Sequence, residues 1–131
     1  MRQCPSCGRE VSEEANYCGN CGASLRSGEP SAIDQMIDDA RRAIASNPND
    51  TSARYNLAIA YKLGGMEDLA RQELTRVAEL QPDFGDAHYE LGLLHAKSGR
   101  TEDAIAALTR ALELEPGHTR AARLLKTLRV R

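Results

Sequence analysis

The sequence predicts a mostly α-helical chain, in which a small metal-bound module precedes a solenoid of stacked helical hairpins. Two observations carry this prediction. All four cysteines lie near the start of the chain, in two pairs of the form Cys-x2-Cys. From residue 51 onwards the chain repeats itself with a period of 34 residues, and small, bulky apolar and turn-forming residues return at matching places. A period of this length is typical of proteins that stack one supersecondary unit.

The cysteine pairs predict a metal site. Cys4 and Cys7 form one pair, and Cys18 and Cys21 form the other. Each Cys-x2-Cys turn places two thiolates on one side of a loop, and two turns together supply the four sulfurs that tetrahedral zinc prefers. Disulfides are disfavoured, because a bridge inside Cys-x2-Cys closes a very small loop and no secretory signal precedes the first pair. A redox dithiol and a four-sulfur iron site remain as alternatives.

The remainder of this module fits a structural metal. Gly8, Gly19 and Gly22 are expected at positive φ in the turns around the cysteines. The apolar residues available as a core are few: Val11, Ala15, Tyr17 and Leu25. So small a core cannot fold alone, and the metal must supply most of the folding energy. Four thiolates leave no open coordination position, so the ion is expected to be structural rather than catalytic.

Residues 1–25 resemble the short double-knuckle zinc ribbons found at the start of many prokaryotic proteins. The resemblance implies one structural Zn²⁺ held by Cys4, Cys7, Cys18 and Cys21, all of which are present. The resemblance predicts a bound metal and does not indicate a particular function. Residues 26–32 are small, polar and turn-prone, and we expect them to form a flexible linker.

Residues 33–131 are expected to form a continuous series of helices. Residues 33–50 form half a repeat, 51–84 and 85–118 form two full repeats, and 119–131 form a capping helix. Two full repeats and two halves equal three units, the rough minimum for a self-supporting solenoid, with about six helices.

The repeated residues explain how each hairpin forms. Ala58 and Gly92 are small where paired helices approach closely, and Gly65 and Gly99 allow the turn inside each hairpin. Pro82 and Pro116 end the second helix of each repeat. Thr101 is expected to cap the helix that follows it.

The period and the pattern of small and large residues resemble the tetratricopeptide repeat. The positions that carry the resemblance recur 34 residues apart: Leu57 and Leu91, Ala58 and Gly92, Tyr61 and His95, Gly65 and Gly99, Ala70 and Ala104, Leu74 and Leu108, Val77 and Ala111, Pro82 and Pro116. The sequence departs from the family at the fourth place of each repeat, where Arg54 and His88 replace a bulky aromatic residue.

The resemblance implies that the first helices of successive repeats line a concave, partner-binding face. The implied groove residues are Ser52, Tyr55, Asn56, Ile59, Lys62, Asp86, Tyr89, Glu90, Leu93, Lys97, Arg120 and Arg123. Tyr55 and Tyr89 would anchor a peptide, or alternatively would only pack against the neighbouring helix. The Lys and Asn clamp with which some family members hold chaperone tails is absent, because Tyr55 and Ile59 take its places.

Composition narrows the function further. The net charge is −2 and aromatic residues make up 4% of the chain, so the overall composition does not favour nucleic acid. There is no membrane-spanning run, and no metalloprotease, phosphate-loop or nucleophile-elbow motif. We therefore expect a non-enzymatic, cytoplasmic adaptor that binds an unidentified protein or peptide, with self-association open. The alternative is a nucleic-acid-associated factor that uses the ribbon and the basic final helix, whose cations otherwise suit a solvated cap.

Overall fold

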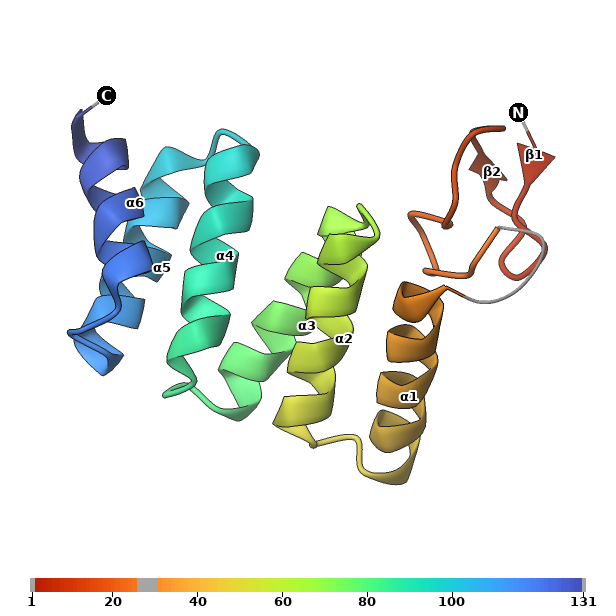
Figure 1. The fold of residues 1–131 in the computed structure, drawn as a ribbon, viewed down its shortest axis with the longest axis horizontal. Helices are drawn as coiled ribbons and strands as arrows, with labels where there is room; N and C mark the ends of the chain where they lie inside the picture. The colour runs from red at the N-terminus through yellow and green to blue at the C-terminus, as the bar shows by residue number, and fades with distance from the viewer. Residues whose placement is uncertain (1, 26–30, 131) are drawn as a thin grey trace. The chain divides into compact units, whose positions relative to one another are not determined.

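The computed structural model describes residues 2–25 and 31–130, and it divides into two units. Unit 1 runs to Glu73 and unit 2 begins at Leu74. Six helices occur among the described residues, after a short two-stranded sheet (Figure 1). This confirms the expected mostly helical class and its number of helices.

The cysteine module opens unit 1 with a small antiparallel sheet. Strand β1 (Arg2–Gln3) pairs with β2 (Glu10–Val11), so that Arg2 lies opposite Val11. A bridge between Tyr17 and Ser24 brings the two sides of the second half together. Val11, Cys4 and Cys18 form the buried cluster of the module, with Leu25 packed against it.

Two of the three glycines expected at positive φ adopt it. Gly8 has a φ of 80° and Gly22 a φ of 77°. Gly19 does not adopt a positive φ, so this part of the prediction is wrong. Gly8 and Gly22 each close a knuckle by donating to the carbonyl of the residue four places earlier, whereas Gly19 lies inside its turn.

Helix α1 (Ala32–Ser46) begins with a capping box in which the Ser31 hydroxyl accepts from the Asp34 amide and the Asp34 carboxylate accepts from the Ser31 amide. The helix therefore begins one residue earlier than expected. The predicted linker otherwise falls on residues 26–30, which lie outside the described residues.

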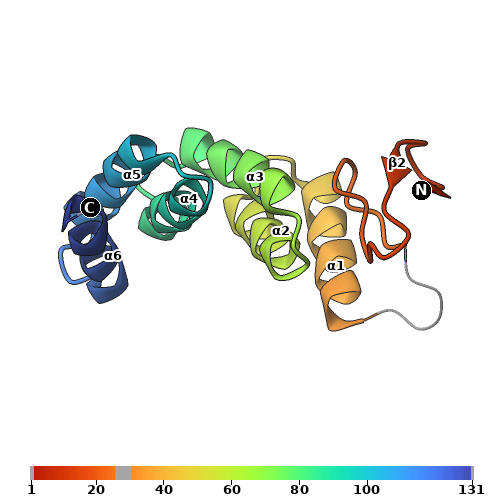
Figure 2. The same cartoon turned by 90° about the horizontal axis from the view of Figure 1, so that it is seen from above.

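Helix α2 (Thr51–Leu63) packs against α1, and α3 (Glu67–Leu80) follows a tight turn (Figures 1 and 2). In this turn Gly65 has a φ of 81°, and the Met66 and Gly65 amides donate to the Tyr61 and Lys62 carbonyls. This pair of bonds is the Schellman arrangement that ends helices at glycine. The glycine turn expected at Gly65 is confirmed.

Unit 2 repeats the same hairpin. Helix α4 (Gly85–Lys97) packs on α5 (Thr101–Leu114), and α5 packs on α6 (Thr119–Val130). Gly99 takes a φ of 79°, with the Arg100 and Gly99 amides donating to the His95 and Ala96 carbonyls. The two hairpin turns are therefore equivalent, 34 residues apart.

The proline predictions hold, and so does the close-contact prediction at Gly92. Helices α3 and α5 end two residues before Pro82 and Pro116. A Cβ added to Gly92 would lie 2.7 Å from Leu108 Cγ, so these paired helices do need a residue without a side chain there. The expected cap at Thr101 is wrong, because Thr101 is already the first helical residue and Arg100 takes the cap position without a side-chain bond.

Candidate metal centre and binding groove

The four cysteine sulfurs converge on one point of the N-terminal module. Their Sγ atoms all lie within 4.8 Å of one another, with 3.7 Å between Cys4 and Cys21 and 3.6 Å between Cys7 and Cys18. Four sulfurs bound to one zinc ion at about 2.3 Å in a tetrahedron lie about 3.8 Å apart. A disulfide needs about 2.0 Å, and all four cysteines are free. The donor set therefore fits zinc.

Backbone amides support the sulfurs in each knuckle. The Ser6 amide points at Cys4 Sγ and the Asn20 amide at Cys18 Sγ, both at 3.4 Å. These two contacts are related by the same spacing in the two knuckles, and such partners orient ligands around a metal.

The thiols differ in their affinity for protons. The Arg9 amide lowers the pKa of Cys7 to about 6, whereas burial raises the pKa of Cys21 to about 11. At neutral pH the Cys21 proton must therefore leave when a metal binds, because thiolates are the ligands. Bound zinc would hold the two knuckles together and would supply no reactive position.

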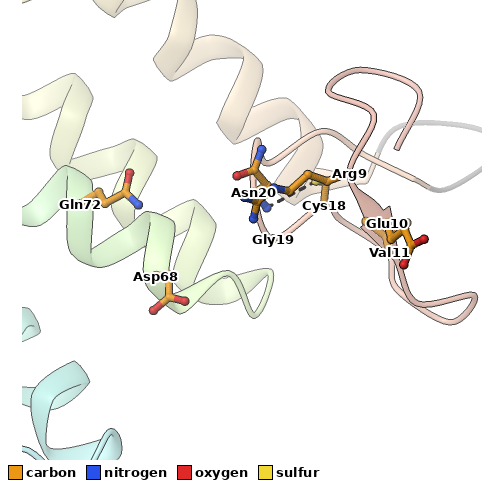
Figure 3. Close-up of a pocket in the computed structure, with 8 residues that line it drawn as sticks. All are labelled: Arg9, Glu10, Val11, Cys18, Gly19, Asn20, Asp68 and Gln72. Atoms are coloured by element: carbon orange, nitrogen blue, oxygen red, sulfur yellow. Dashed lines mark hydrogen bonds between the residues drawn. The ribbon is translucent and has the colours of Figure 1, made fainter. Parts of the chain in front are cut away.

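A shallow polar pocket lies beside the second knuckle, with a volume of about 300 Å³ (Figure 3). Asp68 and Gln72 from α3 line one side, and Arg9 and Asn20 from the module line the other. The lining carries charges of both signs, so it favours no single class of charged ligand.

An apolar groove lies between α1 and α2, also with a volume of about 300 Å³. Its lining residues are Met36, Asp39, Ala40, Ala43, Ala53 and Asn56. Of these, the sequence predicted only Asn56. The other residues belong mostly to α1, where a methionine and alanines at helical spacing are the signal that could have indicated an accessible apolar stripe.

The predicted groove residues of unit 1 are accessible to different extents. Ser52 and Asn56 are exposed, and Tyr55, Ile59 and Lys62 are half-buried. Part of the Tyr55 side chain is therefore accessible at the surface of unit 1.

In unit 2, Tyr89 lies in the apolar core with 7% exposure. The His118 ring packs against it in a tilted arrangement, with 4.6 Å between the ring centroids, and Arg120 Cζ lies 5.7 Å from the centroid of the Tyr89 ring. Glu90 is equally buried, Leu93 is half-buried, and the remaining predicted residues of this unit are exposed: Asp86, Lys97, Arg120 and Arg123. Packing is therefore the use of Tyr89 that its surroundings support.

A second cluster of possible ligands, Asp86, Glu115 and His118, was not predicted. His118 Nδ1 accepts from the Ala121 amide at 3.1 Å and so caps α6. In the neutral ring the proton then lies on Nε2, which faces the Asp86 carboxylate at 3.7 Å. A neutral ring that bound a metal through Nε2 would carry its proton on Nδ1, which could then no longer accept from the Ala121 amide. The cap therefore competes with a metal at this position.

Comparisons with known proteins agree with this architecture. A zinc-ribbon domain model matches residues 3–25, and two tetratricopeptide repeat models match residues 40–72 and 67–119. The chain therefore carries a zinc ribbon followed by tetratricopeptide repeats. Among curated proteins there is no match.

Several solved structures with similar folds are described as tetratricopeptide repeat proteins or domains. YrrB, described as a TPR protein with an unusual peptide-binding site, is 30% identical with a TM-score of 0.66; the match covers 72% of this chain and 48% of that one. The first TPR of Spaghetti (RPAP3), bound to the HSP90 peptide SRMEEVD, is 23% identical with a TM-score of 0.70, covering 73% and 76%.

An enzyme also contains a similar array. A mutant of the O-GlcNAc transferase of Thermobaculum terrenum is 28% identical with a TM-score of 0.69, and the match covers 76% of this chain and 19% of that one. This chain thus spans about a fifth of the enzyme and about half of YrrB. In the described part of the chain, no helix has the length and apolarity needed to cross a membrane.

Proposed function

We propose that this chain is a non-enzymatic adaptor that binds a protein or peptide through its helical repeats, while its ribbon holds one structural zinc ion. The observation that carries the binding role is the groove between α1 and α2, whose alanine floor and flexible Met36 suit an apolar anchor. Asp39 and Asn56 at the groove add polar contacts that would fix the orientation of a bound segment.

The similar proteins support this role at the level of the fold. One is described with a peptide-binding site and another with a bound peptide, and both use repeats of this type. The four-cysteine centre supports a reducing, cytoplasmic location, where thiolates persist as metal ligands.

A charge substitution in the groove tests the proposal. Met36 is 37% exposed, so Met36→Glu places a carboxylate in the groove without emptying the core. The control is Leu63→Glu, at a 58%-exposed apolar residue outside the groove lining. Tyr89 is unsuitable for this test, because truncating it would leave a cavity in the core of unit 2.

Both variants and the wild type would be immobilised and exposed to native lysate. We expect a protein that is retained by the wild type and by Leu63→Glu and is lost from Met36→Glu. Equal retention by all three proteins would contradict binding through this groove. Capture of nothing but nucleic acid would contradict the adaptor role itself.

A second candidate function rests on α6. Arg120, Arg123, Lys126 and Arg129 are exposed on this helix, which carries no acidic residue. This favours an anionic partner such as nucleic acid, whose binding weakens steeply with salt. Retention on immobilised heparin that falls steeply with salt, and is lost in Arg123→Ala/Lys126→Ala, would support it; the slightly acidic net charge opposes it.

A further inference from the structure

We propose that the second zinc knuckle is an interaction surface whose partner is the α1–α2 pair of its own chain, so that zinc binding stabilises these two helices. By the second knuckle we mean residues 18–22. Both surfaces involved belong to unit 1. The inference is separate from peptide binding, because its test needs no binding partner.

One arginine joins the knuckle to both helices. Arg41 Nη2, on α1, donates to the Cys21 carbonyl oxygen at 2.6 Å and to the Tyr61 hydroxyl of α2 at 2.9 Å. The Nη2 atom of the guanidinium carries two hydrogens, one for the carbonyl oxygen and one for the hydroxyl. The guanidinium carbon also lies 5.9 Å from the centroid of the Tyr61 ring. A single cationic group therefore holds the metal module, α1 and α2 at one point.

The knuckle fits closely against Tyr61. A Cβ added to Gly22 would lie 2.7 Å from Tyr61 Cε1 and 3.0 Å from Arg41 Nη2. Tyr61 is only 5% exposed, so its ring has little room to move away. Gly22 is needed here for its positive φ and also for this approach, and only the first of these needs arises inside the ribbon.

Tyr17 makes a second contact with the helices. Its hydroxyl lies 3.0 Å from Ser31 Oγ at the cap of α1, and its Cδ2 would be 3.5 Å from a Cβ on Gly64 at the end of α2. Burial raises the pKa of the neighbouring Asp34 carboxyl, but hydrogen bonds with Tyr17 and Ser31 outweigh burial and keep its pKa below the ordinary value. Tyr17 thus takes part in the capping box that starts α1.

The metal controls this surface because it fixes the shape of the knuckle. The Gly22 amide donates to the Cys18 carbonyl at 2.8 Å, and the Cys18 amide donates to the Ala23 carbonyl at 2.9 Å. These bonds place the Cys21 carbonyl in front of Arg41. The buried cluster of the module consists of two cysteines and Val11, too small a core to keep this shape without a metal.

Hydrogen–deuterium exchange of the full chain, with zinc and after chelation, tests the coupling. We expect chelation to accelerate amide exchange in α1 and α2 about tenfold and to leave α5 and α6 unchanged, since loss of a hydrogen bond to a charged donor has this order of effect. Unchanged exchange in α1 and α2 would overturn the proposal. Equal acceleration throughout unit 2 would overturn it as well.

The variant Arg41→Ala isolates the joint from the metal site. It should keep its zinc, and its α1 and α2 should exchange about tenfold faster than in the wild type even with zinc bound. The matched control is Arg42→Ala, which removes the adjacent exposed arginine of the same helix and should behave as the wild type. If the two variants exchange alike, the Arg41 joint is refuted.

A milder change covers the case in which Arg41→Ala does not fold. Tyr61→Phe removes the hydroxyl that accepts from Arg41 and leaves the buried ring in place. Faster exchange in α1 and α2 of this variant, with zinc content unchanged, is the expected result. Exchange identical to that of the wild type would count against the joint.

Discussion

At the scale of single residues, two equivalent positions of the repeats hold different side chains that make the same contact. Arg54 and His88 replace an expected aromatic residue, and each bonds the proline carbonyl six residues earlier: Arg54 Nε to Pro48 at 2.8 Å and His88 Nε2 to Pro82 at 3.0 Å. Arg54 also pairs with Glu73 at 3.0 Å. At these two positions, the apolar packing of an aromatic residue is therefore replaced by hydrogen bonds to the turn that precedes the helix.

Two glycines of α4 give opposite predictions. Gly92→Ala would press a methyl group against the fully buried Leu108, and we expect a net loss of about 1–2 kcal/mol in unfolding free energy after the gain in helix propensity. Gly85→Ala meets no atom closer than 3.7 Å and has no positive φ, so it should gain about 0.4–1 kcal/mol. Urea unfolding of both variants measures the difference. Equal stability of the two would contradict the close approach of α4 and α5.

At the scale of elements, helix starts were less predictable than helix ends. Glycine and proline leave little choice to the backbone, so the turns at Gly65 and Gly99 and the stops before Pro82 and Pro116 followed from sequence. A cap depends on the register of one or two residues, and any of several polar residues near a start can fill it. For this reason the cap predicted at Thr101 for α5 is wrong. The cap of α2 was not predicted: the Asp50 carboxylate accepts there from the Ala53 amide at 3.0 Å.

The caps can be ranked by mutation. Asp50→Ala removes an observed cap and should lower the unfolding free energy by about 1 kcal/mol. Thr101→Ala removes an exposed hydroxyl inside the first turn of α5 and should change it by less than about 0.5 kcal/mol. Thermal unfolding followed by circular dichroism compares them. A larger loss of unfolding free energy in Thr101→Ala than in Asp50→Ala would contradict this ranking and would support the cap that the sequence predicts at Thr101.

At the scale of the whole molecule, the convergence of the four cysteine sulfurs and the repeat period were predictable, because each follows from a fixed local spacing in the sequence. The contacts of the ribbon with α1 and α2 were not. Tyr17 was expected to fill the core of the ribbon, and nothing in the spacing of Arg41 and Tyr61 indicates that they meet Cys21 and Gly22. The two hydrogen bonds of Arg41 each join residues 20 apart in the sequence, and such contacts depend on tertiary placement, which no local pattern specifies. The α1–α2 groove was largely missed for the same reason, since Met36 and its neighbours lie on a helix outside the two full repeats.

The central claim is that four cysteines build a metal-held module at the start of a helical repeat array. The metal content of the purified chain, measured by elemental analysis for the wild type, Cys18→Ser and Ser6→Ala, tests it most directly. Ser6→Ala is the control, because it alters the first knuckle without removing a sulfur, and the Ser6 contact to Cys4 comes from the backbone. The account predicts one zinc ion per chain in the wild type and in Ser6→Ala, and its loss in Cys18→Ser. A wild type without stoichiometric metal, or a Cys18→Ser variant with unchanged metal content, would contradict it.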